Sequence, residues 1–178
     1  MIELRNHRVT RVTRSRHEAS EPALNDAQKI QTLLDIVEIK ELKANYCVLV
    51  DRAQAQGVEE AKKFAALFAD EFELDLSQIP GGPDPMRTHE SMINFFGEVL
   101  FEATNWTFHS ATNPILDVTG DSATGQWSLH AQAVLAGTPV EAPPLNVFGE
   151  YDEEYVRTAD GWKFAKVLFR DQSPPTAA

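Results

Sequence analysis

The stretch WTFHSATNPILDV, residues 106–118, combines the side chains of a buried strand with a histidine. Val, Ile, Phe, Trp and Thr favour a pleated, half-buried surface, and Trp106–Phe108 are of this kind. His109 then interrupts the apolar run, and Asn113-Pro114 breaks it. A histidine on a strand is commonly held by hydrogen bonds and has no further role. The stretch alone therefore leaves a structural and a functional histidine as alternatives.

The sequence downstream of this stretch predicts a run of antiparallel strands. Four strand-like segments, separated by Gly-containing turns, cover about 104–118, 123–135, 146–157 and 162–170. In the second segment, alternation places Trp127, Leu129, Ala131 and Ala133 on one face and His130 on the other. We expect the first face to point inward.

The sequence upstream predicts a long first helix. Asn25 is a suitable N-cap, with Gln28 three residues later as in a capping box, and Gly57 provides the stop. Between them, apolar residues recur at the spacing of a helix that packs on a core: Ile30, Leu33, Leu34, Val37, Leu42, Tyr46, Leu49, Val50 and Ala53.

Shorter elements connect the first helix to the strands. A second helix is predicted around 61–68, a half-buried strand at Phe72–Leu76 and a third helix from Thr88 or His89 to Glu102. Residues 79–86, IPGGPDPM, contain three prolines and two glycines and must form a loop. We expect this loop to border a pocket.

This order of elements predicts an α+β fold with a curved mixed or antiparallel sheet wrapped around helices, which leaves a cone-shaped pocket. One domain is expected over residues 23–172. Residues 1–22, with five arginines and three glutamates, are expected to be a flexible basic extension, and 173–178 a frayed tail.

Composition excludes several classes of protein. The 178-residue chain has a net charge of −11, which argues against a nucleic-acid partner, and no apolar run is long enough to cross a membrane. Its single cysteine cannot form an internal disulfide or a thiolate zinc cluster and fits a cytoplasmic location. Nucleotide, metalloprotease and serine-hydrolase motifs are missing, so we expect no cofactor and no metal.

Two charged residues are candidates to join His109. Asp51 follows Val48–Val50 near the end of the first helix, and a carboxylate there would fix the tautomer of a histidine ring. Its alternative is exposure to water in the last turns. Arg157 shares the alternation of Tyr151 and Tyr155 and would stabilise developing negative charge, or else form a salt bridge with nearby acids.

Four segments together carry a family resemblance: ELKANYCVLVD, AALFADEFELD, FHSATNPILDV and EYDEEYVRTADGWKFAK. In order and spacing, over roughly Asp26 to Asp171, they resemble SnoaL-like proteins of the nuclear transport factor 2-like superfamily. The enzymes of that superfamily to which the chain is similar are cofactor-independent lyases, such as scytalone dehydratase, hexachlorocyclohexane dehydrochlorinases and bile-acid 7α-dehydratases.

The resemblance implies a site. The proton-accepting pair of these enzymes matches Asp51 and His109, the dehydrochlorinase arginine matches Arg157, and the dehydratase tyrosine matches Tyr46. The strand acid of the bile-acid enzymes has no equivalent here, which argues against carrying over their steroid substrate and indicates an apolar, aromatic ligand. We expect contacts to substrate from Trp127, Leu129, Phe72 and Asn113.

The resulting hypothesis is a lyase of dehydratase type that acts on a small hydrophobic, oxygenated aromatic or alicyclic substrate. Loss of halide, retro-aldol cleavage, cyclisation and isomerisation would use the same residues. The alternatives of another class are a non-catalytic binding protein and a structural β subunit of a ring-hydroxylating oxygenase. Trp106 and Phe108, opposite in alternation to His109, predict an apolar outer face and a homo-oligomer, trimer or dimer.

Overall fold

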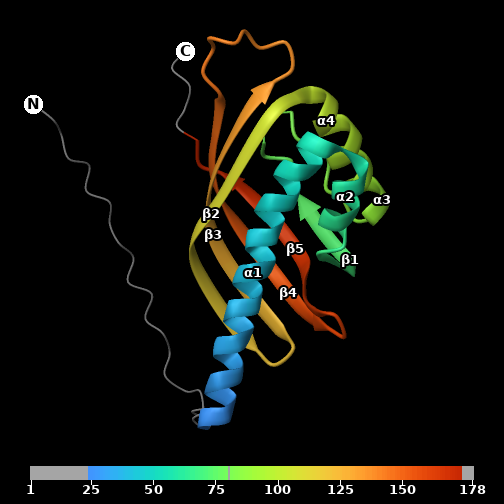
Figure 1. Ribbon diagram of the computed structural model, residues 1–178. Helices are drawn as coiled ribbons and strands as arrows, with labels where there is room; N and C mark the ends of the chain where they lie inside the picture. The colour runs from blue at the N-terminus through green and yellow to red at the C-terminus, as the bar shows by residue number, and fades with distance from the viewer. Residues whose placement is uncertain (1–23, 80, 174–178) are drawn as a thin grey trace, which may run out of the picture.

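A long helix lies across one face of a five-stranded sheet, and shorter helices cover one end (Figure 1). The computed structural model describes residues 24–79 and 81–173. The predicted N-terminal extension and residues 174–178 of the predicted tail lie outside this part. The α+β class predicted from the sequence is confirmed.

Helix α1 (Asp26–Gln56) begins and ends where its sequence predicts. The Asn25 side chain accepts the backbone N–H of Gln28 at 3.0 Å, and the Gln28 side chain accepts that of Asn25 at 2.9 Å. Both donors would otherwise lack a partner at the start of a helix. The helix stops at Gly57, whose φ of 77° suits a residue without a Cβ.

Only one face of α1 packs on the core. From Ile39 to Ala53 its inward residues are buried, but Ile30, Leu33 and Leu34 are more than half exposed. The prediction that one apolar stripe packs along the whole helix is therefore wrong. The reason is the helical face: at 3.6 residues per turn these three side chains lie on the side of α1 opposite Asp35, which is buried and contacts Trp162 and Arg157 of the sheet.

The sheet is mixed and open. It runs in the order β1-β5-β4-β3-β2, with β1 (Phe68–Asp75) parallel to β5 (Gly161–Asp171) and all other neighbours antiparallel. The other strands are β2 (Thr104–Thr119), β3 (Ser122–Leu135) and β4 (Leu145–Thr158). The four predicted C-terminal strands are confirmed, whereas β1 begins four residues before the predicted Phe72.

The short helices form the end of the molecule near the cavity. They are α2 (Val58–Ala65), α3 (His89–Asn94), the π-helical turn η1 (Phe95–Val99) and α4 (Leu100–Ala103). The predicted third helix thus has the right extent but contains a π turn. Gly97 packs there against α2, where a Cβ would lie 2.8 Å from the Cα of Val58.

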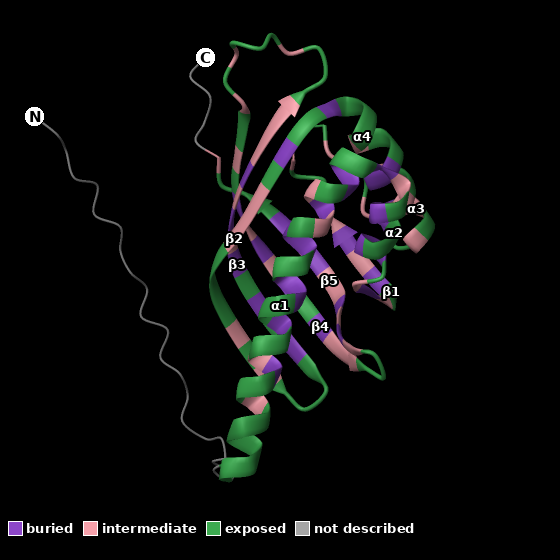
Figure 2. Cartoon of the chain, in the orientation of Figure 1, coloured by how far each residue is buried: buried purple, intermediate pink, exposed green. Residues whose placement is uncertain are grey.

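An aromatic core fills the space between α1, α2 and the sheet. The Tyr46 ring contacts those of Phe64, Tyr151 and Phe164, with centroids 5.0, 5.8 and 5.5 Å away. Buried residues are concentrated on the strands beneath α1 (Figure 2). None of the helices in residues 24–79 and 81–173 is long and apolar enough to span a membrane.

Candidate active site

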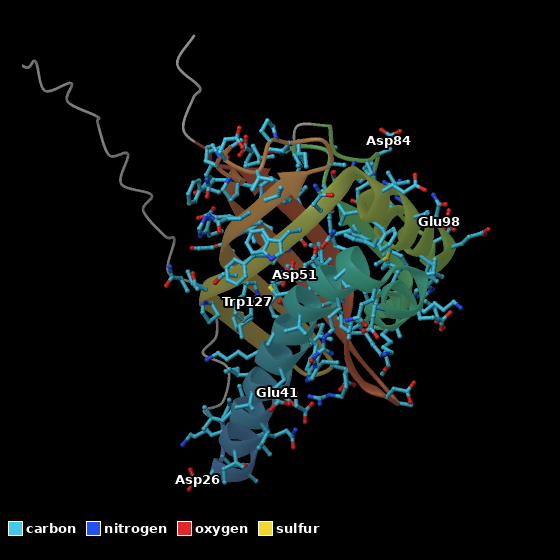
Figure 3. The ribbon with its side chains drawn as sticks, turned by 45° about the horizontal axis from the view of Figure 1, so that its top comes forward. Asp26, Glu41, Asp51, Asp84, Glu98 and Trp127 are labelled. Carbon is cyan, nitrogen blue, oxygen red and sulfur yellow. The ribbon has the colours of Figure 1, made fainter. Side chains whose placement is uncertain are left out.

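Asp51 on α1 and His109 on β2 form a hydrogen-bonded pair, although 58 positions separate them in the chain. Asp51 Oδ1 lies 2.7 Å from His109 Nδ1, and Asp51 Oδ2 accepts the backbone N–H of His109 at 3.0 Å. Asp51 points from the later half of α1 toward the sheet (Figure 3). The two sequence candidates are therefore brought together.

Thr107 completes the support of the carboxylate. Its hydroxyl donates to Asp51 Oδ1 at 2.9 Å, and its side chain is buried on the same face of β2 as His109. Thr107 shares the strand alternation of His109, but the sequence contained no signal for this contact. With three donors around it, the carboxylate is held in one orientation.

These contacts determine the charge of Asp51. Burial acts to raise its pKa, but the hydrogen bonds and charge of His109, together with the Thr107 hydroxyl, outweigh burial and hold the pKa below its usual value. Ionised Asp51 accepts hydrogen bonds only, so the proton of a neutral His109 ring is on Nδ1. The lone pair is then on Nε2, as a proton acceptor requires.

His109 faces a cavity of about 240 Å³ between the sheet and the short helices. Leu129, predicted to contact substrate, lies in its wall, as do Ala131 and Ala133. The predicted loop borders it through Ile79 and residues 81–83. Most of the lining is apolar: Phe95, Phe96, Val99, Leu100, Ala103, Leu135, Leu145 and Val147, with Thr104, Thr107, Gln132 and Tyr151 as polar members.

Three other predicted substrate contacts lie outside this cavity. Trp127 is buried on the inner face of β3, where its indole N–H donates to Tyr155 Oη at 2.9 Å (Figure 3). Phe72 packs between Phe68 and His89. Asn113 is exposed at a β2 irregularity with φ of 53°. Alternation gave these residues a side of the sheet but no position along it.

The structure does not bring Arg157 to His109, which corrects the prediction that it faces the same pocket. Arg157 bonds to Asp35 at 2.7 Å and to Asp121 at 3.1 Å, and its guanidinium lies over Trp162. It is near the end of β4, next to the β4–β5 turn, whereas the cavity contacts the beginning of that strand. The salt-bridge alternative is the one observed.

Tyr46 also lies outside the cavity lining. It is 2% exposed and packs in the aromatic core described above. Burial raises the pKa of its hydroxyl well above the usual value. The predicted proton-donor role therefore has no geometric support, since the Tyr46 side chain is enclosed by other rings.

A second polar group, which sequence reasoning missed, contacts Tyr151 of the cavity wall. Lys43 of α1 forms a fully buried ion pair with Glu153 of β4, which also accepts the Tyr155 hydroxyl. The Lys43 ammonium lies 3.6 Å from the ring centroid of Tyr151. The available signal was a lysine between Leu42 and Tyr46 on the buried side of α1.

Across residues 24–79 and 81–173, no group of three or more His, Cys, Asp or Glu side chains is arranged to hold a metal ion.

The lowered pKa of Asp51 predicts how stability depends on pH. A carboxyl group titrates near 3.9 in an unfolded chain, so a lower pKa in the folded state stabilises the fold above about pH 4. That contribution is lost as the pH falls through the folded-state pKa. We expect the Asp51→Asn variant to be less stable than wild type at pH 7, with a difference that shrinks below about pH 4.

Urea denaturation at several pH values measures this difference. Asp160→Asn changes an exposed turn residue and provides the control. A gap between wild type and Asp51→Asn that stays constant down to pH 3 would contradict the prediction.

Comparison with known proteins identifies the family to which the chain belongs. The SnoaL-like domain matches residues 31–167 of the chain. A search of curated proteins finds no match.

Solved structures have similar folds. A Novosphingobium aromaticivorans protein assigned as an aromatic ring hydroxylase is 25% identical, with a TM-score of 0.66 over 80% of this chain and 92% of its own. Another protein from that organism, assigned as a scytalone dehydratase, is 17% identical, with a TM-score of 0.68 over 84% and 99%. A hexachlorocyclohexane dehydrochlorinase from Novosphingobium barchaimii is 20% identical, with a TM-score of 0.65 over 84% and 96%.

Proposed function

The chain belongs to the SnoaL-like domain family, and on this premise we propose that it is a cofactor-independent lyase of dehydratase type. In the proposed reaction, His109 removes a proton from a carbon of a small hydrophobic, oxygenated substrate, and a group leaves the neighbouring carbon. Dehydration is the preferred form. Loss of halide, retro-aldol cleavage, cyclisation or isomerisation would begin with the same proton transfer.

The observation that carries this proposal is the orientation of His109. Asp51 binds Nδ1 at 2.7 Å, which leaves Nε2 as the basic nitrogen of a residue in the cavity wall. A positioned acid–base group supplies about 10² to 10⁴-fold in rate. The apolar lining would strengthen the effect by excluding water from the reacting atoms.

Each polar residue of the site then has a stated role. His109 is the base, and Asp51 stabilises the imidazolium that forms when His109 takes the proton. Thr107 is a positioning residue because it contacts Asp51 and holds the carboxylate in place. Arg157 and Tyr46 receive no role in this mechanism, because the cavity lining contains neither.

The similar structures favour two classes of function. The scytalone dehydratase and dehydrochlorinase assignments agree with a lyase, while the 25% identical ring-hydroxylase assignment favours the alternative of an oxygenase subunit. The half-buried Asp51–His109 pair supports the lyase, since placing a charged pair partly out of water at a cavity wall has an energetic cost that a structural subunit would not need. Recovery of the chain with a larger iron-containing protein would support the subunit instead.

The proposal is tested by proton abstraction from a neutral probe. The probe 5-nitrobenzisoxazole opens to a coloured cyanophenolate when a base removes its C3 proton and the N–O bond breaks. We expect the purified protein to accelerate this reaction without any added cofactor and to retain its rate after treatment with EDTA. A rate equal to that of the buffer, or a loss on chelation restored by one metal, would contradict the proposal.

We also propose that the protein is a homo-oligomer, a trimer or a dimer. Trp106 and Phe108 on the outer face of β2 are 43% and 44% exposed, and their rings stack at 6.3 Å. Phe148 on β4 extends this apolar surface. Its burial between subunits would stabilise an assembly.

The oligomer prediction is measured by light scattering at micromolar concentration. Wild type should give a mass two or three times that of the 19.8 kDa chain. The variant Trp106→Ser/Phe108→Ser should shift the protein toward the monomer. A wild-type monomer would contradict the prediction.

A further inference from the structure

The cavity at His109 has two apolar walls. Phe95 and Phe96 of the π turn contribute the helical wall, while β3 contributes Ala131 and Ala133 to the sheet wall. The π turn is itself informative, because such turns are rare and occur often at functional sites. A ligand here would contact aromatic rings on one side and small side chains on the other.

The two alanines create the space beside the base. In the β2–β3 register, Ala131 is the direct partner of His109 and Ala133 that of Thr107. Direct cross-strand partners have Cβ atoms about 4.5–5.5 Å apart, so a larger side chain at Ala131 would fill the volume next to the imidazole, and one at Ala133 the cavity volume next to Thr107. These residues therefore limit what can reach Nε2.

The volume limits the ligand further. An apolar cavity of about 150 Å³ accepts benzene, and ligand pockets in general measure about 300–1,000 Å³. At about 240 Å³, this cavity has room for one substituted ring or two fused rings. It does not have room for the four fused rings of a steroid.

The charge of the lining limits the ligand in a second way. Among the described residues, the cavity wall contains no Asp, Glu, Lys or Arg. Its threonine hydroxyls are occupied, Thr104 with the carbonyl of Leu100 and Thr107 with Asp51. An ionised ligand would lose its hydration without gaining an opposite charge in the wall.

We propose that this site takes an uncharged compound of one or two rings, and that Ala131 and Ala133 determine its size limit. The inference rests on the proposed function only in treating the cavity at His109 as the substrate site. The polar atoms of the ligand would lie toward His109, and its rings would lie between Phe95 and the two alanines.

Calorimetric titration at pH 7 tests the proposal with three probes. We expect 2-naphthol to bind to wild type, 2-naphthoate to bind at least roughly tenfold more weakly, and estradiol not to bind. Ala133→Leu should weaken 2-naphthol binding by about tenfold or more. Val134→Leu, on the opposite face of the same strand, is the matched control and should leave binding unchanged.

Phe95→Ala is a second test, in which a side chain of the helical wall is shortened and the sheet wall is unchanged. It should also weaken binding of 2-naphthol, because one apolar wall is removed. Absence of 2-naphthol binding, equal binding of 2-naphthoate or estradiol, or unchanged binding in the folded Ala133→Leu and Phe95→Ala variants would overturn the inference.

These titrations are independent of catalysis. If the binding pattern holds but 5-nitrobenzisoxazole is not opened, the lyase proposal fails and the ligand class stands. If 5-nitrobenzisoxazole is opened but the affinity for ligands does not depend on their ring number and charge, the lyase proposal stands and the ligand class fails.

Discussion

The His109→Asn variant is expected to open 5-nitrobenzisoxazole about 10² to 10⁴-fold more slowly than wild type. Asparagine fits on β2 but has no basic nitrogen to take the proton. Because the base acts on the transition state, the loss should appear in kcat, with KM nearly unchanged. Initial rates over a range of probe concentrations separate the two constants.

Two further variants test whether the loss of rate is specific to the Asp51–His109 pair. Asp51→Asn should also lower kcat, because an amide no longer stabilises the imidazolium and its N–H₂ group favours the wrong tautomer of His109. His130→Asn is the control, since His130 lies on the outer face of β3 and stacks on Phe148. Full activity in folded His109→Asn protein would remove the pair from the mechanism.

Local sequence signals predicted a large part of the fold. The capping pair Asn25 and Gln28, the stop at Gly57 and the turns between strands act over a few residues, so they can be read without tertiary knowledge. Alternation also gave the inward face of β3 correctly from Trp127 to Ala131. The family resemblance added that Asp51 and His109, far apart in sequence, belong together.

Position along an element was the main failure of the sequence analysis. Alternation places Arg157 and Tyr151 on the same face of β4, but the strand is 14 residues long. The cavity includes Tyr151, while Arg157 pairs with Asp35 at the opposite end. Likewise, the apolar residues Ile30, Leu33 and Leu34 lie on the face of α1 that points away from the sheet. The position of Arg157 relative to the cavity and the orientation of α1 on the sheet both depend on strand register and packing, which no local pattern encodes.

The buried Lys43–Glu153 pair has the largest expected effect on stability. Both side chains are at most 1% exposed, and the ammonium also lies 4.2 Å from the ring centroid of Tyr46. Lys43→Met would leave the Glu153 carboxylate buried without its counter-charge. Breaking one partner of such a pair costs about 3–5 kcal/mol, a large share of the roughly 5–15 kcal/mol that stabilises a domain.

Urea denaturation at pH 7 measures this loss, and Lys40→Met, on the exposed side of α1, is the matched control. Lys43→Met/Glu153→Gln separates a lost attraction from an unpaired charge, because glutamine is neutral and its side-chain oxygen can still accept the Tyr155 hydroxyl. An unpaired buried charge is the main cost of breaking such a pair, so the double variant should recover most of the stability. If Lys43→Met alone were as stable as Lys40→Met, the pair would not hold α1 against β4. If the double variant were no more stable than Lys43→Met, an unpaired charge on Glu153 would not be the cause of the loss, contrary to this prediction.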